Sequence, residues 1–268
     1  MNKILKFALL SAAPLLIIAC DSGTPAPPPA ATTGAATTGA ATTGAGAAAT
    51  ATTTAAAAET AATVEKDWTT TVVATPEGGF RMGNPDARVK LVEFASFTCP
   101  HCRDFHKEAV ATLKPNYVKT GMVSLEYRPF VLNVYDFAAT KLAMCEGPDR
   151  FFTWADQLFS HQESWVTPFT KLTEADIEPL KALPPEQQVA ALAVAGGLRD
   201  FARPRGLSRA RFDACLSDAG MMQRLTAQQQ AASDRYQIAG TPTFLLNGKK
   251  VEGVTTWAAL RPKIDAAL

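Results

Sequence analysis

The stretch "LVEFASFTCPHCRDF", residues 91–105, constrains the fold of this chain more than any other. The residues that lead into it, "RVKLVEFASF", are β-branched and aromatic, as in a buried strand. The residues that follow predict a helix with Pro100 in its first turn, which Pro115 should bend or end. The sequence therefore predicts a strand that runs into a helix, with Cys99 and Cys102 at the joint.

The position of the two cysteines predicts unequal reactivity. The first N–H groups of a helix lack partners and carry partial positive charge, so a Cys99 thiolate should be stabilised and its pKa lowered. His101, when protonated, would add a second favourable charge. Cys102 lies one turn further into the helix and should be less exposed. We therefore predict that Cys99 is the nucleophile and that Cys102 resolves the mixed disulfide.

Glu93 lies on the predicted strand among apolar residues, six positions before Cys99. A carboxylate in such a run is costly to bury unless it has a partner or a function. If its pKa is raised, Glu93 can exchange a proton with Cys102. The alternative is a satisfied ion pair on a strand face, and the sequence leaves both interpretations open.

The rest of the chain predicts a fixed order of elements. "GMVSLEYRPFVLN" indicates a second strand, and the pattern is helical from Tyr135 to about Arg235. "TPTFLLNGKKVEGV" then predicts a hairpin that turns at Asn247-Gly248, and a closing helix should be capped by Thr255 or Thr256. Pro242 heads the first hairpin strand, where proline cannot donate a ladder hydrogen bond. A cis Thr241–Pro242 bond would explain this position, although trans bonds are far commoner before proline.

Two of these motifs resemble the DsbA family of bacterial thiol:disulfide oxidoreductases. "EFASFTCPHCRDF" is similar to the active-site segment of that family, and "GTPTFLLNG" to its cis-proline loop. The resemblance covers roughly residues 66–268 and implies the α/β thioredoxin fold with an inserted α-helical domain. It implies that Cys99 is the nucleophile, Cys102 the resolving cysteine, Glu93 the buried acid and Pro242 the cis proline beside the pair.

The same resemblance implies where substrate binds and how the chain is divided. Substrate would lie along the proline loop as an added strand, near Thr241, Pro242 and Pro100. Thr241 replaces the valine of the best-known oxidases, and threonine occurs there in isomerase-type relatives. The expected organisation is a signal peptide (1–20), a flexible tether (21–65), a first thioredoxin part (66–134), an inserted helical domain (135–220) and a second thioredoxin part (221–268).

The chain has five cysteines, an odd number. If Cys20 carries lipid and Cys99 pairs with Cys102, then Cys145 and Cys215 remain, both in predicted helices. We expect a structural disulfide between them, with two buried free thiols as the alternative. No cofactor is expected other than the redox-active Cys99–Cys102 disulfide itself.

A metal site is the competing interpretation of the cysteine pair. It would use Cys99, Cys102 and His106, which lies on the same helix face, but no fourth ligand is evident. We therefore expect no metal and expect His106 to be a surface residue of the helix. His161 has no partner that the sequence identifies.

The N-terminus predicts export and lipid attachment. Lys3 and Lys6 precede an apolar run, residues 7–19, that is too short to span a bilayer and fits a signal peptide. "LIIAC" resembles a bacterial lipoprotein cleavage box, which implies acylation of Cys20, with ordinary cleavage elsewhere as the alternative. Residues 30–58 are only Ala, Thr and Gly, so they cannot build a core and are expected to form a tether on the periplasmic side of the envelope.

The sequence leaves three functions to compare. The first is an oxidase that introduces disulfides into reduced exported proteins and is recharged by a quinone-coupled membrane partner, as the resemblance to DsbA implies. The second is a disulfide isomerase or reductase, and the third is a redox-inactive metal-binding module. We expect a monomeric oxidase, because the "AATTG" repeats occupy the place of the dimerisation domain of related isomerases and cannot form an interface. Basic and acidic residues nearly balance, at 26 and 25, so nothing indicates nucleic-acid binding.

Overall fold

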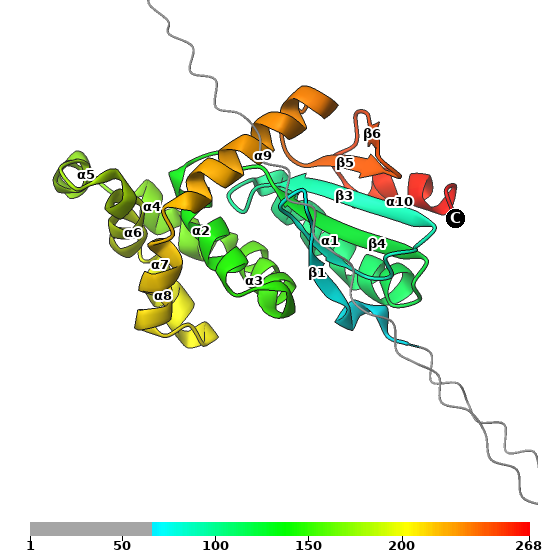
Figure 1. Ribbon diagram of the computed structural model, residues 1–268, viewed down its shortest axis with the longest axis horizontal. Coiled ribbons are helices and arrows are strands. Elements are labelled where there is room, and N and C mark those ends of the chain that lie inside the picture. The colour runs from blue at the N-terminus through cyan, green and yellow to red at the C-terminus, as the bar shows by residue number, and fades with distance from the viewer. Residues whose placement is uncertain (1–65) are drawn as a thin grey trace, which may run out of the picture. The chain divides into compact units, whose positions relative to one another are not determined.

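The computed structural model describes residues 66–268 (Figure 1). The strands are β1 (Val72–Ala74), β2 (Phe80–Met82), β3 (Val89–Ala95), β4 (Val123–Pro129), β5 (Thr243–Leu246) and β6 (Lys249–Val251). The helices are α1 (Pro100–Leu113), α2 (Val134–Cys145), α3 (Pro148–Ser160), α4 (Gln162–Thr170), α5 (Glu174–Lys181), α6 (Pro185–Ala195), α7 (Leu198–Ala202), α8 (Arg209–Leu216), α9 (Gly220–Tyr236) and α10 (Trp257–Asp265). Short 3-10 turns at Trp68–Thr70 and Arg203–Arg205 and a π-helical turn at Lys114–Val118 complete the described secondary structure.

The six strands form one mixed sheet in the order β1-β2-β4-β3-β5-β6. β3 pairs in parallel with β4 and antiparallel with β5, so the strand that leads into the cysteine pair has a neighbour on both sides. The expected α/β thioredoxin fold with inserted helices is confirmed. The sequence did not predict β1 and β2, which extend the sheet beyond β4 through antiparallel pairing.

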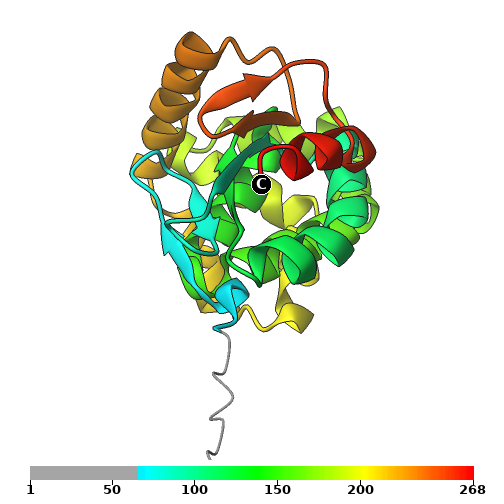
Figure 2. The same ribbon diagram turned by 90° about the vertical axis from the view of Figure 1, so that its right-hand side faces the viewer.

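The two faces of the sheet are covered by different helices (Figure 2). Because side chains alternate along a strand, Leu91 and Ala95 of β3 face the main core with α1 and α10, whereas Val92 and Phe94 face a second cluster that includes Tyr236 of α9. Glu93 has the parity of Leu91 and Ala95. The carboxylate is therefore directed to the face that α1 covers.

The inserted helices α2 to α8 lie beyond one end of the sheet, and the long helix α9 leads back to it (Figure 1). α1 ends at Leu113, and Pro115 lies in the π-helical turn that follows, so the break expected at this proline is present. Asn247 and Gly248, at φ 48° and 79°, make the hairpin turn between β5 and β6. Thr256, rather than Thr255, caps α10 by accepting the Ala259 N–H.

The predicted signal peptide, the lipid-bearing Cys20 and the tether fall in residues 1–65, outside the described part of the chain. Between residues 66 and 268, none of the helices combines the length and the apolar character that crossing a bilayer requires.

Candidate active site

Cys99 caps the N-terminus of α1. Its backbone is extended (φ −75°, ψ 121°), and its sulfur accepts the Cys102 N–H at 3.4 Å. The hydrogen bond from the Cys102 thiol, supported by the backbone N–H groups of Cys102 and His101, lowers the pKa of Cys99 to about 5, although burial opposes this. A cysteine with this pKa is a thiolate at neutral pH.

Cys102 lies in the first turn of α1 and is fully buried, with 0% of its surface exposed. Burial, the Cys99 thiol and the charge of Glu93 hold the pKa of Cys102 well above its ordinary value. Both cysteines are free thiols in this structure, which therefore represents the reduced state. The pair is a thiolate beside a protonated thiol, as the two sequence positions predicted.

Glu93 lies on β3 beneath the cysteines and is 4% exposed. Burial, together with the negative charge of Cys99, raises its pKa to about 8. Its Oε1 is buried without a hydrogen-bond partner among residues 66–268. The sequence left open whether Glu93 is a functional acid or part of a satisfied ion pair. Among the described residues this carboxyl forms no ion pair, so the second interpretation has no support.

A cavity of about 20 Å³ adjoins Glu93 and is also lined by Tyr127 and His106. This is room for about one water molecule. Tyr127 donates its hydroxyl to the Ala95 carbonyl, so its oxygen can still accept a hydrogen bond. The carboxyl of Glu93 is thus near enough to the cysteine pair for its charge to raise the pKa of Cys102, and it also lines this cavity.

The proline loop lies against the nucleophile although it is 142 residues away in the chain. β5 pairs with β3 so that Thr243 is opposite Phe94, and this register brings the preceding residues to Cys99. The Thr241–Pro242 bond is cis, and the Thr241 carbonyl is 3.3 Å from the Cys99 sulfur. A groove of about 330 Å³ runs along residues 239–243, which include the cis proline, and along residues 250–255.

Pro100 and His101 are exposed between the two buried cysteines. They form the part of the pair that an incoming protein would meet first. The structure therefore brings together all the residues predicted to act at the redox site, namely Cys99, Cys102, His101, Glu93, Thr241, Pro242 and Pro100.

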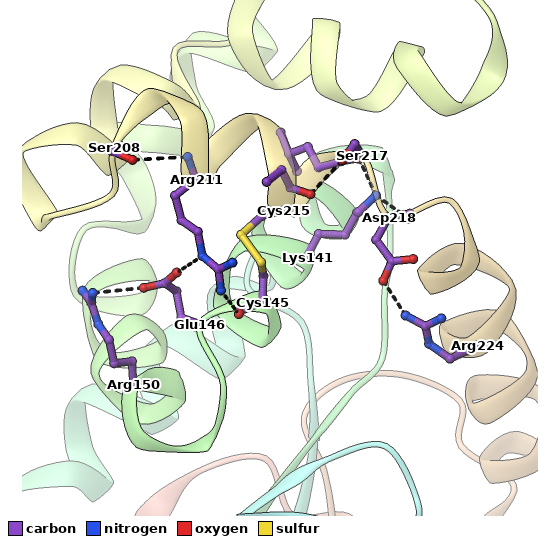
Figure 3. The surroundings of a disulfide bond; sticks show 12 residues. Lys141, Cys145, Glu146, Arg150, Ser208, Arg211, Cys215, Ser217, Asp218 and Arg224 are labelled. Carbon is purple, nitrogen blue, oxygen red and sulfur yellow. Dashed lines mark hydrogen bonds and ion pairs between the residues drawn. A yellow bond between two sulfur atoms is a disulfide. The ribbon is translucent and has the colours of Figure 1, made fainter.

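Cys145 and Cys215 form a disulfide away from this site, with an S–S distance of 2.09 Å (Figure 3). It joins the last residue of α2 to α8 within the inserted helices. Beside it the buried Lys141 donates to the carbonyls of Leu216 and Asp218, and Arg211 donates to the Cys145 carbonyl (Figure 3). The bond and these contacts fasten the end of α2 to α8.

The expectation that His106 is a surface residue is wrong. Its side chain is only 12% exposed, and its Nε2 lies 2.9 Å from Asp156 Oδ1 on α3, a carboxylate that Lys114 also binds. The helix α3 covers this side of α1, which the sequence pattern of α1 alone does not reveal. No three His, Cys, Asp or Glu side chains are grouped as metal ligands among the described residues. His161 contacts the ring of Phe201 and the Gln157 carbonyl.

Two residues that the sequence analysis did not single out touch the active-site loop, residues 96–99. Asp136 of α2 accepts the Phe97 N–H at 2.9 Å, and Gln162 of α4 donates to the carbonyls of Phe97 and Cys99. Asp136 follows the capping residue Asn133, so its position alone suggests a helix-capping acid. Nothing in the sequence around Gln162 distinguishes it from an ordinary helical glutamine.

The fold and the site define a protein class: a thioredoxin-fold protein with an inserted set of helices and an ionised, asymmetric cysteine pair facing a cis proline. The family model described as "Thioredoxin" matches residues 75–266. The chain belongs to the thioredoxin family, and the sequence-based recognition of a DsbA-like member is confirmed at the level of family and fold.

Known proteins agree with this assignment. A protein-disulfide isomerase from Novosphingobium aromaticivorans is similar in structure, with a TM-score of 0.67 and 34% identity over 70% of this chain and 96% of that one. Wolbachia pipientis alpha-DsbA1 shares the fold, with a TM-score of 0.56 and 22% identity over 70% and 89% of the two chains. A putative protein-disulfide oxidoreductase of Rickettsia bellii is 27% identical over 193 residues, 72% of this chain. The match covers 65% of the Rickettsia bellii protein, and 55% of the related protein of Rickettsia typhi.

Proposed function

We propose that this protein is a thiol:disulfide oxidoreductase that introduces disulfide bonds into reduced exported proteins through the Cys99–Cys102 couple. The observation that carries the proposal is that the pKa values of the two neighbouring thiols are shifted in opposite directions. The pKa of Cys99 is about 5, whereas that of Cys102 lies well above its usual value. A stabilised Cys99 thiolate favours the reduced form of the couple. The oxidised form is then a strong electron acceptor for protein thiols.

The reaction balances with groups that the site holds. A client thiolate attacks the Cys99 sulfur of the Cys99–Cys102 disulfide, so that a client–Cys99 bond forms and the internal bond breaks. Cys102 leaves as a thiolate and takes a proton from the carboxyl of Glu93, whose pKa of about 8 keeps it protonated at neutral pH. A second client thiolate attacks the client sulfur, and Cys99 leaves as the stable thiolate. Two electrons pass from the client dithiol to the enzyme.

The groove beside Pro242 supports a client that binds as an extended segment. The Thr241 carbonyl faces the Cys99 sulfur, and the groove continues along residues 250–255. A strand-like segment in this groove would place its cysteine at the exposed edge of the pair, near Pro100 and His101.

An isomerase is the second candidate, and two observations favour it. The Novosphingobium aromaticivorans protein named an isomerase is 34% identical to this chain. Thr241 precedes the cis proline, and the family resemblance implies a threonine there in isomerase-type relatives. An isomerase needs Cys99 as a reduced thiolate, whereas an oxidase needs the Cys99–Cys102 disulfide. The direction of electron flow therefore distinguishes the two functions.

The test compares two rates and one mass. Purified oxidised protein is mixed with a reduced client, and purified reduced protein with a client that carries mispaired disulfides. We expect fast oxidation, slow unscrambling and a monomer by light scattering. A stable dimer that unscrambles well and oxidises poorly would replace the oxidase by the isomerase.

The proposal extends to partners and location. A quinone-coupled membrane protein would reoxidise Cys102 and Cys99, and a lipid on Cys20 would hold the domain at the periplasmic side of the envelope. The support for these two points is the N-terminal sequence and the resemblance to DsbA-like proteins.

A further inference from the structure

The active-site loop, residues 96–99, is held by side chains of the inserted helices. Gln162, the first residue of α4, donates its side-chain amide to the Phe97 carbonyl at 2.8 Å and to the Cys99 carbonyl at 2.9 Å. Asp136 of α2 accepts the Phe97 N–H at 2.9 Å. Both side chains are buried, at 5% and 0% exposure. Groups that come from outside the thioredoxin part therefore satisfy the backbone on both sides of Phe97.

Gln162 uses both of its amide hydrogens on this loop. One reaches the Phe97 carbonyl and the other the Cys99 carbonyl, which also accepts the Arg103 N–H and so closes the first turn of α1. A buried carbonyl that loses its donor is costly, so the loop has little freedom to rotate its peptide groups while this amide is in place. The same carbonyl fixes the orientation of the turn whose Cys102 N–H points at the Cys99 sulfur.

Asp136 and its neighbour Asn133 hold the other end of the loop. The second carboxylate oxygen of Asp136 accepts the Leu132 N–H at 2.9 Å, and Asn133 donates to the Thr98 hydroxyl at 2.9 Å. The segment that leaves β4 for the inserted helices is thereby tied to the loop that precedes Cys99. Gln162 and Asp136 come from two different inserted helices, so hydrogen bonds from both α4 and α2 hold the loop.

We propose that Gln162 is a positioning residue for Cys99: by holding the Phe97 and Cys99 carbonyls it keeps the start of α1 aligned on the sulfur, and the inserted helices thereby set the stability of the thiolate. Asp136 supports the same alignment from the Phe97 amide. The consequence for catalysis rests on the proposed oxidoreductase function, but the alignment itself is a property of the reduced protein without a client.

Gln162 can affect the thiolate because a hydrogen bond to sulfur depends on the direction of the donor N–H. A thiolate at a helix start is stabilised by N–H groups that point at it, and that stabilisation falls quickly as the N–H···S angle bends away from linear. Without Gln162, the buried Phe97 carbonyl loses its donor and the Cys99 carbonyl keeps only the Arg103 N–H, so the peptide groups of residues 97–99 turn toward water or other donors. The Cys102 N–H then aligns less well with the sulfur, so the thiolate is stabilised less.

The experiment uses Gln162→Met and a matched control, Gln188→Met. Methionine keeps the length of the side chain and removes both donors. Gln188 of α6 also joins two carbonyls with its amide, those of Lys181 and Leu183 at 3.3 and 2.9 Å, at the end of α5 and outside the active-site loop. Each reduced variant is titrated by the ultraviolet absorbance of the thiolate, and its melting temperature is recorded.

We expect Gln162→Met to raise the pKa of Cys99 by about half a unit to one unit, roughly the net worth of one ordinary hydrogen bond. The reduced form loses the same amount of stability, so the equilibrium against glutathione should shift about three- to tenfold toward the disulfide. Gln188→Met should lower the melting temperature without moving either quantity. If Gln162→Met lowers the melting temperature and leaves the Cys99 pKa unchanged, Gln162 is structural only and the proposal fails.

Gln162→Glu keeps the shape and decides the question if the methionine variant does not fold. A buried carboxyl that faces two carbonyl oxygens keeps its proton, so it donates one hydrogen bond where the amide donates two. We expect a smaller rise of the Cys99 pKa than with methionine, and an unchanged pKa would overturn the proposal. Client oxidation is measured separately, so a protein that oxidises no client but shows the pKa shift would refute the proposed function and leave the positioning role standing.

Discussion

Replacing Glu93 with Gln should change how the stability of the protein depends on pH. The carboxyl is buried, Oε1 has no hydrogen-bond partner, and its pKa is about 8 instead of the usual 4.5. Between these two values the folded state holds a proton that the unfolded state has released. The free energy of unfolding therefore falls as pH rises from about 4.5 to about 8. The stability that the proton on Glu93 contributes is fully present only below about pH 4.5.

The magnitude follows from the size of the shift. One pKa unit corresponds to about 1.4 kcal/mol, so a carboxyl with these two values would cost the folded state up to about 4 to 5 kcal/mol at the top of the window. A water molecule in the adjoining cavity would moderate this cost, and we expect about 3 kcal/mol. The amide introduced by Glu93→Gln cannot ionise, and any penalty for packing it is the same at every pH. The difference between the two proteins should thus grow by about 3 kcal/mol across the window.

Urea unfolding of the oxidised proteins at several pH values measures this difference. The oxidised form has no Cys99 thiolate, and burial, the larger cause of the raised pKa, remains. Glu126→Gln on the neighbouring strand is the control, because that buried glutamate is bound by Arg128 and Thr75. Glu126→Gln should lower the free energy of unfolding, and this loss should not become smaller as the pH rises. Parallel curves for the wild type and Glu93→Gln would refute the argument that this carboxyl is buried in an unfavourable state.

Four further outcomes are expected. The acidic transition in thiolate absorbance should disappear in Cys99→Ala, and a wild-type transition near the free-cysteine pKa would contradict the site geometry. Replacing Cys145 and Cys215 with alanine should cost up to about 4 kcal/mol in urea unfolding, because the bond closes a loop of 70 residues; an unchanged midpoint would show that the bond adds no stability. Asp156→Asn should destabilise by about 1 to 3 kcal/mol, since it weakens one contact of α3 with α1 and one with the π-helical turn that follows α1, and equal stability would mean that these ion pairs contribute nothing. Cys20→Ser should release the protein from membranes or block its processing, and fractionation that still finds it processed and membrane-bound would exclude the lipid anchor.

The sequence predicted the fold where local signals were strong. The strand before Cys99, the helix after it and the hairpin at Asn247-Gly248 each have a pattern that one short window contains. β1 and β2 have three residues each and are stabilised by pairing, with Phe80 opposite Tyr127. A segment of three residues has no period to recognise, which is why these strands were not predicted.

The candidate site divides in the same way. The order of cysteines, helix start and proline loop is readable in the sequence, so the redox pair and the residues around it could be singled out. His106, Gln162 and Asp136 depend on contacts with residues 39 to 65 positions away. Their chemistry is ordinary for helical residues, and only the packing of the inserted helices against α1 and its loop gives them a partner.

The register of β5 on β3 also governs what happens while the chain is being made. Synthesis proceeds from the N-terminus, so the two reactive thiols emerge about 140 residues before the loop that covers them. Until β5 arrives, β3 is an open edge with Val92 and Phe94 uncovered, and in an oxidising compartment the uncovered thiols are free to react with Cys145. Any chain that is cut short before Thr243 therefore combines an unprotected edge strand with an uncovered pair of cysteines, two features that promote aggregation and wrong disulfides.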